Sequence, residues 1–263
     1  MKPTVSVIIP TYNRKEELRE LLLALTLQTR QDFEVILYND AGDDVSAVVR
    51  ECPGLSITLI NATTNSGHVR ARNVALGSAQ GLYVMPIDDD DLILPTHIES
   101  LVKVMDEADL AYTDAEVVVW RKTGYGRVPL GRHPFAFEFN RNLLREWNTI
   151  IPSGILYRRE LHEVLGLFDE EVADYWDWDF ILRVTSTHAV IRVASASVLY
   201  AIDEDGGNAS ANPAAMGGNL VKLCEKHGLG ELPSSNFLLM TVDERLHSFR
   251  RMTSIVWDGK PIR

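Results

Sequence analysis

The chain has 263 residues, of which 46% are hydrophobic and 24% are charged. This is the composition of a soluble globular protein, and it excludes the disordered, collagen-like and disulfide-stapled classes. With 26 basic and 37 acidic residues, the formal net charge is −11, so we expect no general affinity for nucleic acid or for anionic membrane surfaces. A phosphate-bearing ligand would need a local source of positive charge.

The first residues of the chain and its two cysteines indicate the cellular compartment of the protein. The first apolar run ends at Pro10, which makes it too short for a signal peptide or a membrane span. Cys52 and Cys224 lie far apart and neither has a CxxC partner, so we expect two buried thiols rather than a zinc or redox site. The sequence predicts a cytoplasmic protein without a transmembrane segment, and it leaves peripheral binding at the inner membrane face open.

About the first hundred residues alternate strand and helix patterns. Asn13 and Glu16 have the spacing of a capping box before a helix with leucines at helical intervals, and a second helix is expected over residues 69–79. Short apolar runs predict buried parallel strands over residues 5–9, 33–38, 56–60 and 83–87. The alternation predicts an α/β fold with a doubly wound, mostly parallel central sheet flanked by helices.

The alternation ends near residue 110. Hairpin-like pieces over 110–113 and 116–120 precede a basic stretch, residues 121–141, which would either bind an anion or form a solvated loop. A strand over 154–157, helices over 159–165 and 177–186, and a last strand over 189–193 follow. Residues 203–218 contain four glycines and are expected to be a mobile loop that closes over a ligand, before helical patterns resume.

Four consecutive aspartates, residues 88–91, follow the fourth expected strand, at the sheet edge where α/β proteins bind ligands. Like charges this close raise each other's pKa unless a cation lies among them. Mn²⁺ and Mg²⁺ prefer carboxylate and phosphate oxygen, so the cluster predicts a metal ion that helps to hold a diphosphate. Asp91 also fits a turn or a helix cap. The chain has neither GxGxxG nor GxxxxGK[ST], which argues against NAD and P-loop sites.

Several short segments occur in a characteristic order. They are VSVIIPTYNR at 5–14, ND at 39–40, NSG at 65–67 leading to ARN at 71–73, IDDDD at 87–91, PSG at 152–154, GLFDE at 166–170 and WDWD at 176–179. Together they resemble family 2 of the glycosyltransferases, which has the GT-A fold, and the resemblance covers about residues 3–200. It implies a metal-dependent enzyme that moves a sugar from a nucleoside diphosphate donor to an acceptor hydroxyl and inverts the anomeric centre.

The resemblance implies a donor site. It assigns nucleotide binding to Thr11, Tyr12, Arg14, Asp40, Arg72, Asp88 and Asp89, and metal binding to Asp90. Asp40 is expected to accept hydrogen bonds from the nucleobase, and Asp88 is expected to lie near the ribose. Arg72 is expected to face either the diphosphate or Asp88. The family often carries a metal-binding histidine after its last strand, and residues 200–205 contain none. Either Asp203 or Asp205 replaces it, or the metal relies on Asp90, phosphate and water.

The resemblance also implies an acceptor site with Asp177 as general base. An attacking sugar hydroxyl must lose a proton, and a carboxylate within hydrogen-bond reach can take it. Asp177 and Asp179 are two apart and point in opposite directions on a helix, and Asp179 can pair with Arg183 at i+4, so Asp177 is preferred. Trp176 stands where the family often has glutamate, and either stacks on a sugar or fills core. Trp176, Asp179 and Gly154 are the candidates for acceptor binding.

The chain divides into 1–112, the nucleotide-sugar-binding half; 113–202, the acceptor-binding and catalytic-base half of the same domain; the loop 203–218; and a C-terminal helical extension, 219–263. UDP or dTDP is the expected nucleotide, and polysaccharide, lipid-linked and small-molecule hydroxyl acceptors are all open. Two alternatives are kept. A sugar nucleotidyltransferase would need a glycine-rich basic loop after the first strand, and residues 10–14 contain no glycine. A non-catalytic nucleotide-sugar-binding scaffold would be expected to lack the base.

Overall fold

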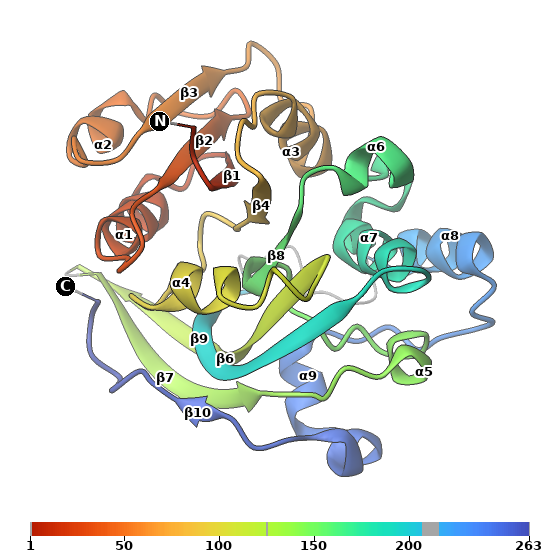
Figure 1. The fold of residues 1–263 in the computed structure, drawn as a ribbon. Helices are drawn as coiled ribbons and strands as arrows, with labels where there is room; N and C mark the ends of the chain where they lie inside the picture. The colour runs from red at the N-terminus through yellow and green to blue at the C-terminus, as the bar shows by residue number, and fades with distance from the viewer. Residues whose placement is uncertain (1, 125, 207–215, 263) are drawn as a thin grey trace.

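The computed structural model describes residues 2–124, 126–206 and 216–262 (Figure 1). Its N-terminal half alternates strands and helices. The strands are β1 (Val5–Thr11), β2 (Phe33–Asn39), β3 (Ile57–Asn61), β4 (Tyr83–Pro86) and β5 (Leu92–Ile93). The helices are α1 (Lys15–Thr26), α2 (Ser46–Arg50), α3 (His68–Gly77) and α4 (His97–Val102). The four expected strands and the two expected helices of this region are confirmed.

The C-terminal half has longer strands and shorter helices. The strands are β6 (Leu110–Thr123), β7 (Gly126–Phe135), β8 (Ile155–Arg158), β9 (Val190–Asp203) and β10 (Ser254–Ile255). The α-helices are α5 (Arg141–Leu144), α6 (Leu161–Leu165), α7 (Trp176–Thr185), α8 (Gly217–His227) and α9 (Phe237–Val242). The 3₁₀ helices are η1 (Pro152–Gly154), η2 (Glu170–Tyr175) and η4 (Glu244–Phe249).

The strands form one ten-stranded sheet in the order β10-β9-β6-β8-β4-β1-β2-β3, with β5 paired to β9 and β7 to β6. Strands β1 to β4 are mutually parallel, and so are β6 and β9, whereas β8 runs antiparallel between β4 and β6. The predicted mostly parallel central sheet flanked by helices is confirmed. Because β1 lies between β2 and β4, the chain reverses its direction of winding beside β1, which is where such sheets bind ligands.

Alternate side chains of β1 enter two different cores. Val7 and Ile9 pack with the leucines of α1 on one face of the sheet, while Ile8 packs with α3 and α7 on the other. This is the two-residue period of a strand that is covered on both faces. In Figure 1, α1 and α3 accordingly lie on opposite sides of the β1–β2 pair. The carboxyl end of β1 is thereby held rigidly in the centre of the molecule.

Three local expectations are wrong. Asn13 does not cap α1: its Oδ1 accepts a hydrogen bond from the Asp43 amide, which ties the loop after β1 to the loop after β2. The two hairpin pieces near residue 110 are a single strand of 14 residues, β6. The last expected strand, 189–193, continues to Asp203 as β9, because it pairs along the length of β6.

The basic stretch 121–141 forms the end of β6, strand β7 and the start of α5 rather than a loop. Four of its cations are paired with carboxylates. The pairs are Arg121 with Glu204, Lys122 with Glu17, Arg127 with Glu20, and Arg132 with Glu116. The expected solvated loop therefore gives way to a hairpin whose strands are joined by the last pair and which the other three pairs attach to α1 and to the end of β9.

The remaining expectations concern the membrane, the cysteines and the glycine-rich loop. The longest described helix, α1, has 12 residues, and no helix within the described ranges has both the length and the apolar composition that crossing a bilayer requires. Cys52 and Cys224 are buried free thiols, as predicted. Most of the expected mobile loop, residues 207–215, lies outside the described residues, and helix α8 begins at Gly217.

Candidate active site

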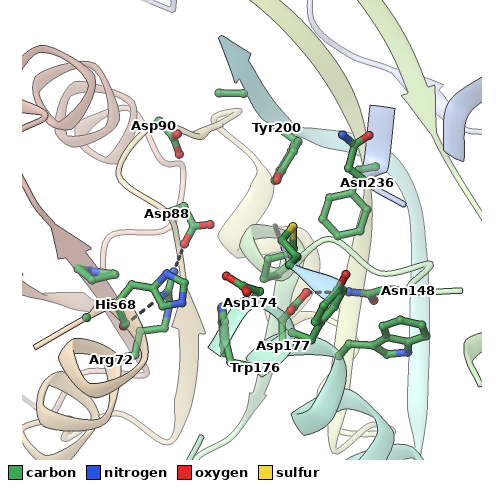
Figure 2. A pocket seen from close by; sticks show the side chains of 18 of the residues that line it. His68, Arg72, Asp88, Asp90, Asn148, Asp174, Trp176, Asp177, Tyr200 and Asn236 are labelled. Carbon is green, nitrogen blue, oxygen red and sulfur yellow. Dashed lines mark hydrogen bonds and ion pairs between the residues drawn. The ribbon is translucent and has the colours of Figure 1, made fainter. Parts of the chain in front are cut away.

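A cavity of about 440 Å³ opens at the carboxyl ends of β1 and β4. Figure 2 shows Asp88, Asp90, His68 and Arg72 on one side of it, and Asn148, Asp177, Tyr200 and Asn236 on the other. The lining includes most of the site residues predicted from sequence: Thr11, Tyr12, Arg14, Asp40, Arg72, Asp88, Asp89, Asp90, Trp176 and Asp177. Gly154 and Asp179 do not line it.

Arg72 lies between the first aspartate and a tryptophan. Its guanidinium is ion-paired with Asp88, donates from Nη1 to the His68 carbonyl oxygen, and lies 4.2 Å from the ring centroid of Trp176. Of the two predicted orientations of Arg72, the structure has the one toward Asp88. Trp176 is 4% exposed and also packs edge-on against Phe168, so its ring serves core packing and the cavity wall together.

Asp88, Asp89 and Asp90, hereafter the aspartate cluster, share a second arginine. Arg14 Nη1 donates to Asp90 Oδ2 at 2.6 Å and to Asp89 Oδ1 at 3.2 Å. Burial and the charge of Asp90 raise the pKa of Asp89 to about 7, and burial also raises the pKa of Asp90. Asp89 Oδ2 is buried and has no hydrogen-bond partner within the described part of the chain. The cluster retains capacity for a further cation.

The fourth aspartate supports the cluster from behind. Asp91 is fully buried and accepts hydrogen bonds from Ser153 Oγ at 2.5 Å and from the Ala201 amide at 2.8 Å. Ser153 Oγ in turn accepts from the Asp88 amide at 3.2 Å. A side chain at Gly154 would meet the Thr113 carbonyl oxygen at 3.2 Å. The PSG segment thus positions Asp88, and the expected acceptor contact of Gly154 is wrong because close backbone packing occupies its surroundings.

Asp40 and His68 hold the loop before α3. Asp40 Oδ1 accepts from the Ser66 amide at 2.8 Å and Oδ2 from the Gly67 amide at 2.8 Å. Gly67 has φ +88°, which favours glycine. His68 Nε2 donates to the Ala173 carbonyl oxygen at 3.0 Å, and burial and the charge of Arg72 lower its pKa.

Asp177 faces the cavity from the first turn of α7 and is 6% exposed. Asn148 Nδ2 donates to its Oδ2 at 2.7 Å. Burial raises the pKa of Asp177 to about 6. Asn148 was not predicted from the sequence, because it lies in a segment without a motif and reaches Asp177 only through the tertiary fold.

Asp179 does not line the cavity, in contrast to Asp177, and it is fully buried. Its carboxylate lies 2.8 Å from Arg183 Nη2, 2.7 Å from Lys226 Nζ and 2.7 Å from His227 Nε2. Burial opposes ionisation, but the bonds to His227 and Lys226 and the charge of Arg183 lower its pKa to about 2. The expected acceptor contact of Asp179 is wrong: this carboxylate joins α7 to α8 outside the cavity.

The C-terminal segment supplies cavity residues that the sequence did not indicate. They are Met216, Leu220, Pro233, Ser235, Asn236, Phe237 and Met240. Neither Asp203 nor Asp205 lines the cavity, and Asp203 Oδ2 lies 3.3 Å from Lys122 Nζ. Over the described residues, no three His, Cys, Asp or Glu side chains are grouped so that they could hold a metal ion by themselves.

Comparison with known proteins identifies the family. Residues 6–166 match the profile described as Glycosyl transferase family 2. The chain belongs to glycosyltransferase family 2. It is 42% identical over 259 residues to the "Uncharacterized glycosyltransferase YwdF" of Bacillus subtilis, a match that covers 98% of this chain and 97% of that relative. The "PGL/p-HBAD biosynthesis glycosyltransferase" of Mycobacterium bovis is 27% identical over 78% of each chain.

Solved structures show the same GT-A fold. S. aureus TarS 1–349 in complex with UDP-GlcNAc has a TM-score of 0.65 and 23% identity, over 86% of this chain and 66% of that one. The mannosyltransferase PcManGT from Pyrobaculum calidifontis, in complex with GDP-Man and Mn²⁺, has a TM-score of 0.61 and 22% identity, over 89% of this chain and 66% of that one. The protein is therefore a family 2 glycosyltransferase, and the nucleotidyltransferase alternative is set aside.

Proposed function

We propose that this family 2 glycosyltransferase moves a sugar from a nucleoside diphosphate donor to an acceptor hydroxyl, in one displacement that inverts the anomeric centre. The observation that carries the proposal is the position of the Asp177 carboxylate, which faces the aspartate cluster across one cavity (Figure 2). A displacement needs a base on one side of the anomeric carbon and a stabilised leaving group on the other.

Asp177 is the general base in this proposal. A pKa of about 6 leaves its carboxylate mostly ionised at neutral pH, yet basic enough to take a proton in the transition state. Asn148 holds Oδ2 and so fixes the orientation of the carboxylate. As the acceptor oxygen bonds to the anomeric carbon, its proton passes to Asp177 and the bond to the diphosphate oxygen breaks.

The opposite side of the cavity binds the donor. Tyr12 is half exposed and can stack on the nucleobase of the donor, with Thr11 and Asp40 beside it. Arg14 and Arg72 line this side, each paired with a carboxylate of the aspartate cluster, and they reduce the negative charge that a diphosphate would meet in a protein of net charge −11. The TarS chain has been solved with UDP and with UDP-GlcNAc, which supports a pyrimidine donor such as UDP or dTDP.

The aspartate cluster fits a divalent cation. Its donors are carboxylate oxygens, burial and mutual repulsion raise the pKa values of Asp89 and Asp90, and Asp89 Oδ2 has no partner within the described residues. Asp90 and Asp88 would hold Mn²⁺ or Mg²⁺ together with phosphate oxygens and water, since no larger group of protein ligands is present among the described residues. When bound, the ion stabilises the charge of the leaving diphosphate.

The test is calorimetric titration of the protein with UDP, dTDP, GDP and CDP, each with and without Mn²⁺. We expect one pyrimidine nucleotide to bind and Mn²⁺ to tighten it, and we expect Asp90→Ala to remove the effect of Mn²⁺, on the order of a hundredfold. Metal-dependent binding that survives in Asp90→Ala would place the ion elsewhere. Absence of nucleotide binding under every condition would overturn both the transferase proposal and the nucleotide-sugar-binding scaffold.

A further inference from the structure

The two sides of the cavity differ in charge. On the donor side, Arg14 and Arg72 lie against the aspartate cluster. On the side around Asp177, the described lining contains no lysine, arginine or histidine, but it does contain the carboxylates of Glu146 and Asp174. Residues 207–215 have no ionisable side chain in the sequence. The cations of the 121–141 stretch do not line the cavity. Arg72 borders this side, where its guanidinium lies over the Trp176 ring, and it is ion-paired with Asp88. The rest of this side has no described cation to receive an anionic group.

The same side is mainly aromatic and aliphatic. The apolar wall is formed by Trp147, Tyr175, Trp178, Leu220, Phe237 and Met240. Five of its six members are largely buried even without a ligand, with Trp147, Tyr175, Trp178, Leu220 and Met240 between 3% and 8% exposed, and Phe237 is partly exposed. A concave surface of this kind gains most of its binding energy from burying apolar area, and it uses a few polar groups for orientation.

One polar atom in the wall lacks a partner. Tyr175 is 7% exposed, and its hydroxyl makes no hydrogen bond within the described residues. Burial and the charges of Asp174 and Asp177 raise its pKa to about 12, so the hydroxyl keeps its proton. A buried donor without a partner costs free energy that a ligand oxygen would recover. Tyr175 is among the residues that line the cavity, so its hydroxyl can donate to an acceptor oxygen near Asp177 once a ligand moves the wall around it.

We propose that the acceptor is an uncharged molecule with an apolar body, either a glycoside with an apolar aglycone or an apolar alcohol. Its apolar part packs on the apolar wall, and one of its oxygens accepts a hydrogen bond from Tyr175. Phosphorylated and carboxylated acceptors are rejected, because they would meet the carboxylates of Asp177, Asp174 and Glu146 without a counter-charge. This inference rests on the proposed sugar transfer, since it assigns the side around Asp177 to the acceptor.

The experiment compares three probes by calorimetry in the presence of UDP and Mn²⁺: octyl β-D-glucopyranoside below its micelle concentration, methyl β-D-glucopyranoside, and glucose 6-phosphate. We expect the octyl glycoside to bind at least about tenfold tighter than the methyl glycoside, and the phosphate to bind more weakly than either. Equal affinity for the two glycosides, no binding of the octyl glycoside, or preference for the phosphate would each overturn the proposal.

Three variants locate the binding. Tyr175→Phe removes only the hydroxyl and is expected to weaken octyl glycoside binding about fivefold. Phe237→Ala is expected to weaken it more, whereas Leu239→Ala, on the same helix α9 but 50% exposed and outside the cavity lining, should not change it. Unchanged affinity in both Tyr175→Phe and Phe237→Ala would contradict the assignment, and melting temperature and UDP affinity report whether each variant is folded.

Failure of this inference is distinguishable from failure of the proposed function. If the wild-type protein binds UDP with Mn²⁺ but prefers the phosphate or ignores the octyl chain, the acceptor class is wrong and the transferase proposal stands. If no nucleotide binds and the octyl glycoside still binds through Tyr175 and Phe237, the apolar subsite stands and the proposed transfer fails.

Discussion

The donor and acceptor sides of the cavity are built in different ways. The donor side consists of the ends of adjacent parallel strands and carries its charges in pairs, Arg14 with Asp90 and Arg72 with Asp88. The acceptor side is assembled from η2, α7, the segment around Asn148 and the C-terminal segment, and most of it is apolar. One side is suited to a ligand of fixed charge and the other to a ligand with an apolar surface.

Under the proposed function, the difference would let one cavity treat its two substrates separately. The donor-side arginines neutralise carboxylates and remain near the diphosphate position, whereas the acceptor side gives Asp177 a low-dielectric surrounding that raises its pKa. A general base with a raised pKa needs apolar surroundings, whereas a site for a charged donor needs polar and charged side chains. Mutations confined to one side should therefore change one property and spare the other.

The largest expected effect is on turnover. Asp177→Asn keeps the shape of the side chain but removes the proton acceptor, so the rate of nucleoside diphosphate release should fall by roughly 10²–10⁴-fold. Donor binding should stay normal because the donor side is unchanged. The measurement pairs steady-state release of nucleoside diphosphate, with octyl β-D-glucopyranoside as acceptor, with calorimetric titration of UDP and Mn²⁺.

Asp174→Asn is the matched control, because Asp174 also lines the cavity and its Oδ2 accepts from Asn219 Nδ2 at 2.6 Å. Asp174→Asn should reduce turnover far less than Asp177→Asn does. Near-normal turnover in Asp177→Asn together with a large loss in Asp174→Asn would move the base to Asp174. Loss of UDP affinity in Asp177→Asn would show that the two sides are not independent.

The next effect is on stability and concerns the support of the acceptor side. Asp179→Ala leaves Arg183 and Lys226 without their buried counter-charge and should lower the free energy of unfolding by about 3 kcal/mol. Denaturant titration measures this. Glu99→Gln, which removes an exposed i,i+4 pair with Lys103, is the control and should cost no more than about 0.5 kcal/mol.

The same contacts predict an acid dependence. Folding lowers the pKa of Asp179 from 3.8 to about 2, so its charge stabilises the fold fully above about pH 4 and this contribution disappears as the pH falls towards 2. The wild-type protein should lose more stability over that interval than Asp179→Ala does. Parallel stability curves for the two proteins between pH 4 and pH 2 would contradict the ion-pair account.

The sequence predicted that the residues after β1, β2 and β4 come together at one cavity for a physical reason. These residues follow consecutive strands of one parallel sheet, and the ends of such strands meet at one edge wherever the strands themselves are recognised. Thr11, Asp40 and Asp88 each follow or end an apolar run that is visible in the sequence. Details that depend on side-chain choice, such as the use of Asn13 to tie two loops together, were not predictable in this way.

The acceptor side and the β6–β7 hairpin were predicted poorly because long-range contacts determine both. Among the described strands, β7 pairs only with β6, and it contains Pro129 and Pro134, which edge strands tolerate, so it lacks the apolar alternation of a central strand. Asn148 reaches Asp177 across the fold, and the apolar wall gathers side chains from segments distant in sequence. No local pattern marks such residues.

The smallest effect tests the electrostatics of the acceptor side alone. The Asn148 amide bonds to the ionised form of Asp177, so Asn148→Ala should raise the pKa of Asp177 by about one unit. Since the base must be ionised to act, the acidic limb of kcat/KM should move from near pH 6 to near pH 7.

The control is Asn142→Ala on the exposed face of α5, which should leave the acidic limb in place. If the acidic limb of kcat/KM does not move in Asn148→Ala, or if it moves to lower pH, the ionisation of Asp177 does not determine that limb. If the activity of Asn148→Ala returns at high pH while UDP affinity is unchanged throughout, the loss is electrostatic and lies on the acceptor side. If activity stays low at every pH, Asn148 acts mainly by orienting the carboxylate, and the geometry of Asp177 then matters more than its pKa.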